Sequence, residues 1–402
     1  MRFKHYYISE LLSEISMGPF GSNIKKECFV NSGIPVLNGS NLTDIALNDD
    51  SFRYVTEEKA NSLGKANAYR GDVVVTHRGT LGQISFIPEN SLYDRYVISQ
   101  SQFRFRCNNK VLPEYLVYYY HTRQGQYELL SNASQVGVPA LARATTTFQR
   151  LEIDIPPIDY QRKVVRLLED IREKMKINKK INKNLEQQAQ AYFNELFVVN
   201  AVPTWSECTL SDIGTIVAGG TPSKSKPEYY TKQGIAWITP KDLAVDKSKF
   251  ISHGANDISE LGFSKSSATK MPAGTVLFSS RAPIGYIAIA QNEVTTNQGF
   301  KSVVPNETIG TAYVYFLLKN LLPTIEGMAS GSTFKEISGT GMKTVPTIMP
   351  DMSTIQRFNT FCKPIFKEQE ILEEKNHRLS ALRDSLLPKL MSGELDVSNL
   401  DL

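Results

Sequence analysis

The sequence predicts an α/β (α+β) protein with two tandem globular domains, each followed by a long helix. Three observations lead to this prediction. The stretch of about 37 residues from Gln161 to Phe197 lacks Gly and Pro and has helical periodicity. A second stripe of helical spacing lies near the C-terminus, and the order of motifs in the first half recurs after about 200 residues. A length of 402 residues also favours two or three domains over one core.

The central stretch carries a narrow apolar stripe that is interrupted by Asn178 and Asn182. The other members of the stripe recur at steps of three and four: Val164, Leu168, Ile171, Met175, Leu185, Ala189, Tyr192 and Leu196. A helix of this length is about 55 Å long and needs a partner along the stripe. The C-terminal stripe offers one because its apolar residues are seven apart: Phe358, Ile365, Leu372, Leu379 and Leu386. We expect the two helices to form a coiled coil whose register the asparagines fix; two helices docked separately on the globular domains are the alternative.

Charge and cysteine usage narrow the class of protein. The formal net charge is +4, and the excess is concentrated between Arg162 and Lys183, where nine basic residues accompany three acidic ones. Such a run is either a solvated helix face or a contact for a protein or polyanion. The four cysteines have no CxxC spacing, which argues against a disulfide framework or a zinc site. No N-terminal signal and no apolar stretch of membrane-spanning length are present, so we expect a cytoplasmic protein without membrane contact.

The first half reads as short strands followed by helix and loop. The predicted strands are apolar, β-branched or aromatic runs: Ile34–Leu37, Asp72–Thr76, Gln83–Ile87 and Gln102–Arg106. Pro113–Leu130 has the pattern of one helix, with Pro in its first turn. The polar, small-residue segment Ser131–Thr147 is predicted to be a loop.

The same order of motifs begins again near Trp205. Gly33–Leu42 aligns with Gly234–Leu243, and Gly71–Gly82 aligns with Gly274–Gly285. Further matches follow in the same order: Ser99-Gln100 with Asn297-Gln298, Tyr118 with Tyr315, and Gln161 with Gln356. Conserved order at a nearly constant offset indicates a tandem duplication. It predicts a domain at 1–157, a spacer helix at 158–199, a second domain at 200–351, and a C-terminal spacer helix with its tail at 352–402.

The sequence carries no recognisable catalytic signature. The five histidines lack HxxxH or HExxH spacing, and no GxxxxGK[ST] loop exists. Gly219-Gly-Thr-Pro-Ser-Lys224 looks superficially suited to phosphate, but it lacks the second glycine of such a loop, and Pro222 removes a backbone donor. A structured turn is the preferred interpretation. We therefore expect no catalytic residue, metal or cofactor in this chain.

Polar loops that follow the predicted strands are the remaining candidates for a binding site. Arg78 and Arg281 each come just after an apolar strand, where a guanidinium could read guanine or hold a phosphate; an ordinary ion pair would explain each of them equally well. Asn38, Ser40 and Asn41 follow an earlier predicted strand, as Thr239 and Lys241 do in the second copy. Capping of a turn would explain these polar residues equally well. The candidates are Asn38, Ser40, Asn41, Thr76, His77, Arg78 and Gln100 in the first domain, and Thr221, Ser223, Lys224, Thr239, Lys241, Ser280, Arg281, Asn297, Gln298, Ser332 and Lys335 in the second.

The second half contains a set of recognisable motifs: Gly219-Gly-Thr-Pro-Ser223, Tyr229-Tyr230, Trp237–Leu243, Ser280-Arg281, Ile284-Gly285, Asn297-Gln298 and the ending Leu386–Leu395. These motifs resemble those of a known family, the specificity subunits of type I restriction-modification systems. The likeness covers nearly the whole chain, because domain, helix, domain, helix is also the order of that family. The first copy departs from the pattern at Gly18–Ser22 and at Asn38–Asn41, as expected if the two domains read different sequences.

The resemblance implies a non-catalytic DNA-specificity subunit. It implies two target recognition domains, each reading one half of a bipartite, asymmetric site in double-stranded DNA, held apart by an antiparallel helix pair that docks two methyltransferase subunits. The resemblance leaves open whether two restriction subunits also join the complex. S-adenosylmethionine, ATP and Mg would then belong to the partner subunits. Two alternatives remain: a DNA-modifying enzyme with an unrecognised site, and a duplicated protein scaffold that does not bind DNA.

Overall fold

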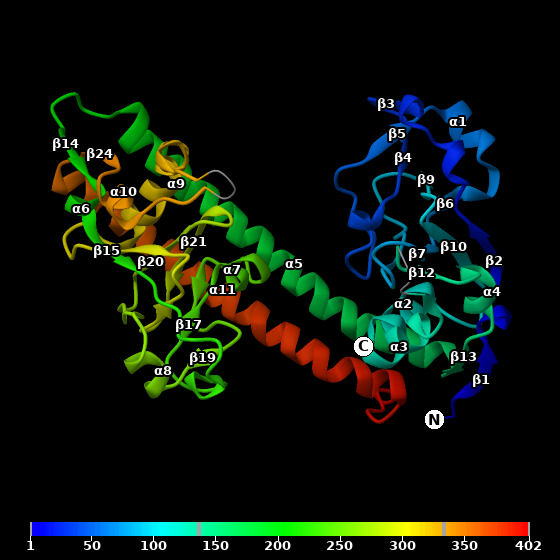
Figure 1. The fold of residues 1–402 in the computed structure, drawn as a ribbon. Helices are drawn as coiled ribbons and strands as arrows, with labels where there is room; N and C mark the ends of the chain where they lie inside the picture. Colours follow the sequence, from blue (N-terminus) through cyan, green and yellow to red (C-terminus); the bar gives the residue numbers. More distant parts are fainter. Residues whose placement is uncertain (1, 135–137, 332–334, 401–402) are drawn as a thin grey trace. The chain divides into compact units, whose positions relative to one another are not determined.

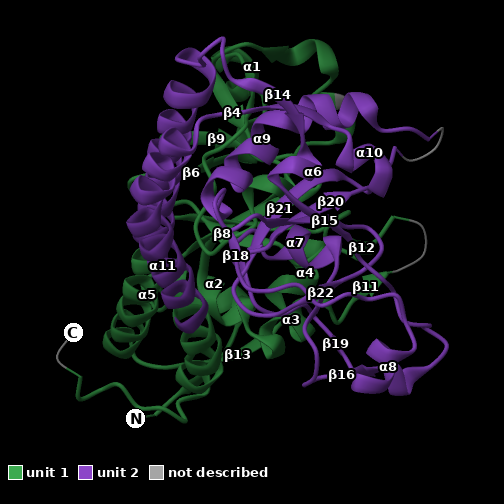
Figure 2. Cartoon of the chain, turned by 90° about the vertical axis from the view of Figure 1, so that its left-hand side faces the viewer, with its two compact units in different colours: residues 1–174, 379–402 green, residues 175–378 purple. Residues whose placement is uncertain are grey.

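A computed structural model describes residues 2–134, 138–331 and 335–400 of the chain (Figure 1). Its contacts divide the chain into two compact units, each of which has its own hydrophobic core. Unit 1 contains Met1–Lys174 together with Leu379–Leu402, and unit 2 contains Met175–Arg378 (Figure 2). The four-segment division derived from the sequence follows the repeat instead of the contacts, and it stays a prediction.

Unit 1 is built on a four-stranded antiparallel sheet of order β2-β10-β7-β8. Phe103 and Phe105 alternate along the central strand and enter the core, whereas Arg104 faces the other way and pairs with the buried Asp72. This period of two is what a half-buried strand requires. The strands are β2 (Leu12–Met17), β10 (Gln102–Cys107), β7 (Asp72–Thr76) and β8 (Ile84–Phe86).

A second sheet of five short strands, in the order β3-β5-β4-β9-β6, completes the globular part of unit 1. It consists of β3 (Phe29–Val30), β5 (Arg53–Val55), β4 (Ile34–Val36), β9 (Arg95–Val97) and β6 (Asn67–Tyr69). The other elements include the pair β1 (Lys4–Tyr7) with β13 (Glu152–Ile155), the pair β11 (Ala133–Ser134) with β12 (Ala140–Leu141), and the helices α1 (Glu57–Ser62), α2 (Pro113–His121), α3 (Arg123–Leu130) and α4 (Ala144–Gln149).

Unit 2 repeats the topology of unit 1. Its sheet has the order β15-β23-β20-β21-β18, in which the first four strands correspond to β2, β10, β7 and β8, and β18 is added parallel to β21. In unit 1 an isolated parallel bridge between Ala46 and Phe86 stands in place of β18. The strands are β15 (Gly214–Ala218), β23 (Lys301–Pro305), β20 (Val276–Ser280), β21 (Ile284–Ala290) and β18 (Phe250–Ile251). Shared strand order supports the duplication predicted from sequence.

The smaller elements of unit 2 surround this sheet. The pair β14 with β24 corresponds to β1 with β13 in unit 1. In chain order these elements are β14 (Ser206–Thr209), α6 (Leu210–Ile213), β16 (Tyr230–Thr231), β17 (Trp237–Ile238), α7 (Pro240–Val245), β19 (Asp257–Ile258), α8 (Glu260–Ser264), β22 (Thr295–Thr296), α9 (Thr311–Met328), α10 (Gly339–Lys343) and β24 (Pro346–Met349).

Two long helices, α5 (Ile158–Asn194) and α11 (Met352–Ser392), confirm the predicted pair. Within unit 2, Asn178 Nδ2 donates to Asn376 Oδ1 at 2.9 Å, and Gln369 Nε2 donates to the carbonyl of Asn182 at 3.1 Å. Residue numbers rise along α5 as they fall along α11, so the helices are antiparallel. The predicted asparagines therefore lie in the seam between the helices. Beyond Asn194, α5 ends in a π-helical turn, Glu195–Val199.

Two sequence predictions need correction. Pro113–Leu130 is two helices, because Thr122 has an extended backbone (φ −72°, ψ 159°) and its hydroxyl accepts a hydrogen bond from the Gly125 N–H at 3.0 Å. This local cap competes successfully with a continuous helix. The segment Ser131–Thr147 is not only loop, since it contains β11, β12 and the first turns of α4. The four predicted strands are present, with ends shifted by at most one residue.

Candidate nucleic-acid interface

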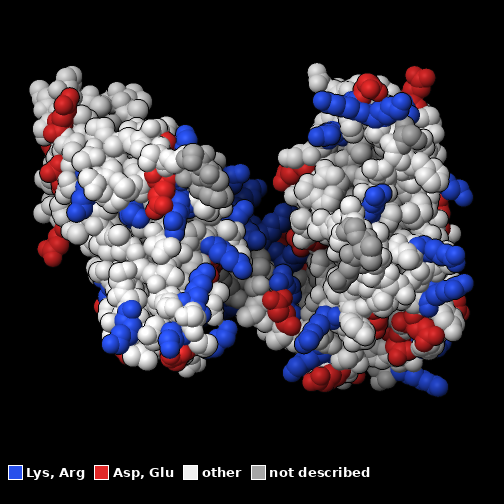
Figure 3. All heavy atoms as spheres, viewed as in Figure 1, with Lys and Arg blue, Asp and Glu red and all other residues white. Residues whose placement is uncertain are grey.

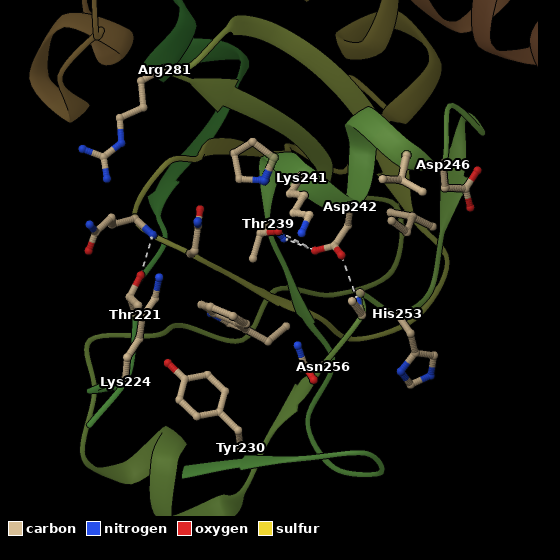
Figure 4. Close-up of a pocket in the computed structure, with 18 residues that line it drawn as sticks. Thr221, Lys224, Tyr230, Thr239, Lys241, Asp242, Asp246, His253, Asn256 and Arg281 are labelled. Atoms are coloured by element: carbon tan, nitrogen blue, oxygen red, sulfur yellow. Dashed lines mark hydrogen bonds between the residues drawn. The ribbon is translucent and has the colours of Figure 1, made fainter. Parts of the chain in front are cut away.

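A groove with a volume of about 840 Å³ opens on unit 2. Figure 4 shows side chains that project from separate loops around one hollow. Seven of the residues predicted from sequence line it: Thr221, Lys224, Thr239, Lys241, Arg281, Asn297 and Gln298. They come from segments that follow β15, β17, β20 and β22. The fold thus collects donors and acceptors that are far apart in the sequence.

The turn at Gly219-Gly220 holds one wall of the groove. A Cβ on Gly219 would lie 1.9 Å from the carbonyl oxygen of Asn297, so only glycine permits this approach of two backbones. Gly220 N–H donates to the Thr296 carbonyl at 2.9 Å, and the indole N–H of Trp237 donates to the Gly220 carbonyl at 2.9 Å. These backbone groups are engaged within the protein. The segment is therefore the structured turn expected from sequence.

Asp242 ties the opposite wall together. Its Oδ2 accepts hydrogen bonds from the backbone N–H and the hydroxyl of Thr239, at 2.7 and 2.6 Å, at the start of α7. Its Oδ1 accepts from the N–H of Ala255 at 2.9 Å. One carboxylate thereby joins α7 to the loop before β19. Lys241, on the first turn of α7, remains exposed at the rim.

Aromatic residues form a further part of the lining. The rings of Tyr230 and Trp237 meet edge to face, with centroids 5.6 Å apart. The Tyr230 hydroxyl donates to the carbonyl of Pro222 at 2.7 Å, and burial raises the pKa of this phenol. Sequence reasoning had not assigned a site role to Tyr230, Trp237, Asp242, His253 or Asn256, all of which line the groove. The signal for three of them, Tyr230, Trp237 and Asp242, was their place in the family motifs Tyr229-Tyr230 and Trp237–Leu243.

Arg281 both lines the groove and takes part in an ion pair. Its NH1 atom lies 3.2 Å from Glu336 Oε2, and its side chain is 36% exposed. Lys301 Nζ lies 3.5 Å from the other carboxylate oxygen of Glu336. The sequence left two interpretations of Arg281 open, an ion pair and a ligand contact. The structure makes them compatible, because Arg281 pairs with Glu336 and also lines the groove.

Some predicted residues of the second domain lie elsewhere. Ser280 is fully buried, and its hydroxyl donates to the Gly299 carbonyl at 3.1 Å. Ser223 and Lys335 are exposed but do not line the groove. Ser332 lies outside the described residues.

In unit 1, the loop after β7 carries His77 and Arg78, and His77 contacts Gln100 in the segment before β10. His77 Nε2 lies 3.2 Å from the Gln100 carbonyl, and burial lowers the pKa of this imidazole. Arg78 is exposed, and its backbone bridges to Ala140. The loops that carry these three residues lie after β7 and before β10, which correspond to β20 and β23 in unit 2. Arg281 and Gln298 lie in the equivalent loops of unit 2.

The remaining first-domain candidates act within their own loops. Asn38 Oδ1 accepts from the N–H and the hydroxyl of Ser40, at 2.8 and 2.5 Å. Asn41 is fully buried, and its amide donates to the carbonyls of Asn48 and Asp50. Thr76 is also buried, at the end of β7. Turn capping therefore accounts for the contacts of Asn38 and Asn41, whereas the exposed face of Ser40 stays accessible.

Charge is unevenly distributed over unit 2. On the face shown in Figure 3, Lys and Arg side chains gather over the part that carries β17, β19 and α8, with few acidic side chains beside them. A basic surface next to a groove lined by amides, hydroxyls and a guanidinium suits a polyanion that also presents hydrogen-bonding edges.

Comparison with known proteins decides the family. A model of the type I restriction modification DNA specificity domain matches this chain twice, at residues 15–187 and 203–381. The chain belongs to this family. Each unit contributes most of one specificity domain, and together the two matches cover most of the sequence.

Individual relatives agree with this assignment of two specificity domains. The type I restriction enzyme MjaIX specificity subunit of Methanocaldococcus jannaschii is 36% identical over 191 residues, which cover 45% of this chain and 44% of the relative. The type I restriction enzyme HindI specificity subunit of Haemophilus influenzae is 23% identical, with 95% of this chain and 99% of the relative covered. The crystal structure of a type I S subunit from M. genitalium has the same fold, with a TM-score of 0.60 at 16% identity, covering 97% of this chain and 96% of that one.

As a type I specificity subunit, this chain recognises the DNA target within the restriction-modification complex, and it is itself non-catalytic. Among the described residues, no group of three or more His, Cys, Asp or Glu is arranged to hold a metal ion. None of the helices in the described part of the chain has both the length and the apolar character needed to cross a membrane.

Proposed function

We propose that the groove of unit 2 reads one half of a bipartite, asymmetric DNA target. The loops of unit 1 that carry His77, Arg78 and Gln100 read the other half. The observation that carries this proposal is the convergence of Thr221, Lys224, Arg281 and Gln298 on one groove. Guanidinium and amide groups form the commonest specific contacts to base edges, and ammonium groups neutralise phosphates.

Different loops on a shared framework support two different half-sites. The strand order is common to both units, but Asn38-Gly-Ser-Asn41 stands where the second copy has Thr239-Pro-Lys-Asp242. Because base-reading groups are carried by loops, a change of loop changes the sequence read without a change of fold. The antiparallel helices would then act as the spacer that fixes the gap between the half-sites.

The partners follow from the same proposal. Two methyltransferase subunits dock through the helical spacer, and two restriction subunits join in the complete enzyme, in the cytoplasm where the DNA is. S-adenosylmethionine is bound by the methyltransferase subunits, and ATP and Mg by the restriction subunits. The present chain determines which DNA sequence the complex recognises.

Co-expression with the methyltransferase subunit of the same system tests this function. We expect sequencing of the methylated host DNA to return two short half-sites separated by a fixed, unspecified gap. Arg281→Ala should cost about 1 to 3 kcal/mol of specific binding if Arg281 reads a base. A stable complex that shows neither methylation nor salt-sensitive binding to duplex DNA would favour the scaffold alternative.

A further inference from the structure

The ion pair of Arg281 belongs to a larger cluster that is anchored on its buried side. Lys301 is 8% exposed, and its ammonium lies within hydrogen-bonding distance of Ser280 Oγ at 3.4 Å and the Gln298 carbonyl at 3.3 Å. It also reaches Glu336 Oε1 at 3.5 Å, while Glu336 Oε2 faces Arg281. One carboxylate is thus held between a buried ammonium and a half-exposed guanidinium.

The backbone beneath this carboxylate is fixed as well. Glu336 exchanges two backbone hydrogen bonds with Ser330, at 2.9 and 3.1 Å, and the next residue, Ile337, donates to the Ser280 carbonyl at 3.1 Å. Glu336 also forms an isolated antiparallel bridge with Arg281. The backbone that carries this carboxylate is therefore hydrogen-bonded both to Ser330 and to the end of β20.

The duplication provides an internal comparison for this cluster. Arg78 is the counterpart of Arg281, and its backbone bridges to Ala140 as that of Arg281 bridges to Glu336. Thr76 pairs with Gln102 in unit 1, and its counterpart Ser279 pairs with Phe300 in unit 2. The next residue along the strand is Phe103 in unit 1 and Lys301 in unit 2, so a phenylalanine stands in place of the buried lysine. Among the described residues, Arg78 has no ion-pair partner. The carboxylate and the ammonium are therefore peculiar to the second domain.

A guanidinium that is held in this way has a defined use. It has five N–H donors in a rigid fork, and its hydrogen bond to Glu336 is donated by NH1. Arg281 also lines the groove, and among the described residues its other donors have no hydrogen-bond partner. Fixing the fork reduces the rotamer freedom that must be lost when a flat, two-acceptor edge is bound. A phosphate, in contrast, can be neutralised by a mobile cation from many directions.

We propose that Glu336 is a positioning residue that fixes Arg281 for reading a guanine in the half-site of the second domain. This inference rests on the proposed DNA-reading role of the groove. Guanine is the base concerned because its O6 and N7 atoms form the paired acceptors that match an arginine fork. Lys301 acts on Glu336 from the buried side, whereas Arg78, without such support, serves as a phosphate contact in the first domain.

The test uses the complex of the full chain with its methyltransferase partner. Binding is measured on the duplex target given by the methylation pattern, and on duplexes changed at each position of the second half-site in turn. The variants are Glu336→Gln, Arg281→Ala, the double variant, and Arg78→Ala as a matched control. Glu336→Asp keeps the charge but moves the carboxylate away from Arg281. It provides a second test if the Glu336→Gln chain does not assemble with the methyltransferase partner.

We expect Glu336→Gln to lower discrimination by roughly fivefold or more at one guanine position, with no change in the salt dependence of binding. Arg281→Ala should abolish discrimination at the same position, and the double variant should match Arg281→Ala alone. Glu336→Asp should fall between the original chain and Glu336→Gln. Arg78→Ala should weaken binding to all sequences alike and reduce the salt dependence.

Other results overturn the inference in distinguishable ways. If Arg281→Ala changes discrimination but Glu336→Gln and Glu336→Asp do not, Arg281 reads DNA without help from Glu336. If Glu336→Gln weakens binding to every sequence equally, its role is structural. If Arg281→Ala leaves binding unchanged, Arg281 does not read a base and the inference fails; the proposed function fails as well only if the methylation pattern contains no second half-site.

Discussion

Lys249 donates a hydrogen bond of 2.6 Å to Gln369 Oε1, although its side chain is almost completely buried. Its ammonium also pairs with Glu186 and lies 4.1 Å from the ring centroid of Phe366. Glu186 belongs to α5 and Gln369 to α11, whereas Lys249 immediately precedes β18. One buried cation thus joins the sheet of unit 2 to both long helices.

Replacement of this cation should destabilise unit 2. We expect Lys249→Met to lower the free energy of unfolding by about 3 kcal/mol, because it removes one partner of a buried ion pair and leaves Glu186 with Lys319 alone. Urea denaturation measures the change. Lys319→Met is the control, since Lys319 is one-third exposed and should cost about 1 kcal/mol or less. Equal losses in the two variants would contradict the role assigned to burial.

The same cluster predicts a pH dependence. Burial acts to raise the pKa of Glu186, but its ion pairs with Lys249 and Lys319 prevail, and the pKa is lowered from its usual value of 4.5. The unfolded chain therefore takes up this proton more readily than the folded chain does. Stabilisation by Glu186 is present above pH 4.5 and is lost as the pH falls through the lowered pKa. Unfolding measured from neutral to acid pH should show this loss in the original chain and not in Glu186→Gln; parallel curves would refute it.

The polar contact between Asn178 and Asn376 should matter more for register than for stability. Asn178→Leu alone removes the donor to Asn376 Oδ1 in the seam, while Asn376 Nδ2 keeps the Met175 carbonyl, and we expect the change to cost about 1 to 3 kcal/mol. The double replacement Asn178→Leu with Asn376→Leu should recover most of this loss, because apolar pairs pack well at seam positions. Denaturation of the original chain and of these two variants measures both effects. A double variant less stable than Asn178→Leu would show that the amides contribute net stability.

Lys241 lies exposed at the rim of the groove and should act as a phosphate contact. Lys241→Ala is expected to weaken binding to all duplexes alike, and to reduce the slope of log affinity against log salt by about one. Anisotropy titrations at several salt concentrations supply both quantities. A loss confined to one DNA sequence would instead make Lys241 a base contact.

The close approach at Gly219 should be essential for the groove. In Gly219→Ala the new methyl group would overlap the Asn297 carbonyl, so we expect a loss of about 2 to 4 kcal/mol in stability and a loss of specific DNA binding. Gly327→Ala is the matched control, because a Cβ there meets nothing within 4 Å; its effect should stay below about 1 kcal/mol. Thermal unfolding and DNA binding together make the comparison, and similar behaviour of the two variants would argue against this packing.

Local patterns predicted the strands and the long helices well because the signal lies within each segment. The apolar run Asp72–Thr76 and the alternation of Phe103 and Phe105 are sufficient to indicate strands. The break at Thr122 was missed, since a single hydroxyl cap overrides the helical pattern on both sides of it.

The groove was only partly predictable for a different reason. Arg281 and Gln298 follow strands and could be picked out as loop donors, but Glu336 is 55 positions away from Arg281 in the sequence. No periodicity connects these two residues. Asn41 shows the opposite failure: its amide is polar and lies in a turn, yet burial directs it inward to the backbone. Partners and accessibility depend on tertiary contacts, which the local pattern does not contain.

The last residues of the chain complete the core of unit 1. Leu390, Met391 and Val397 are buried among residues of the first domain, and the Tyr160 hydroxyl donates to the carbonyl of Leu395 at 2.8 Å. Unit 2 is contained in the uninterrupted segment that ends at Arg378. During synthesis, the ribosome therefore delivers every residue of unit 2 before it delivers the segment that closes unit 1. The unit that is begun first therefore cannot complete its core until after unit 2 has been synthesised, because part of that core is supplied by Leu390, Met391 and Val397.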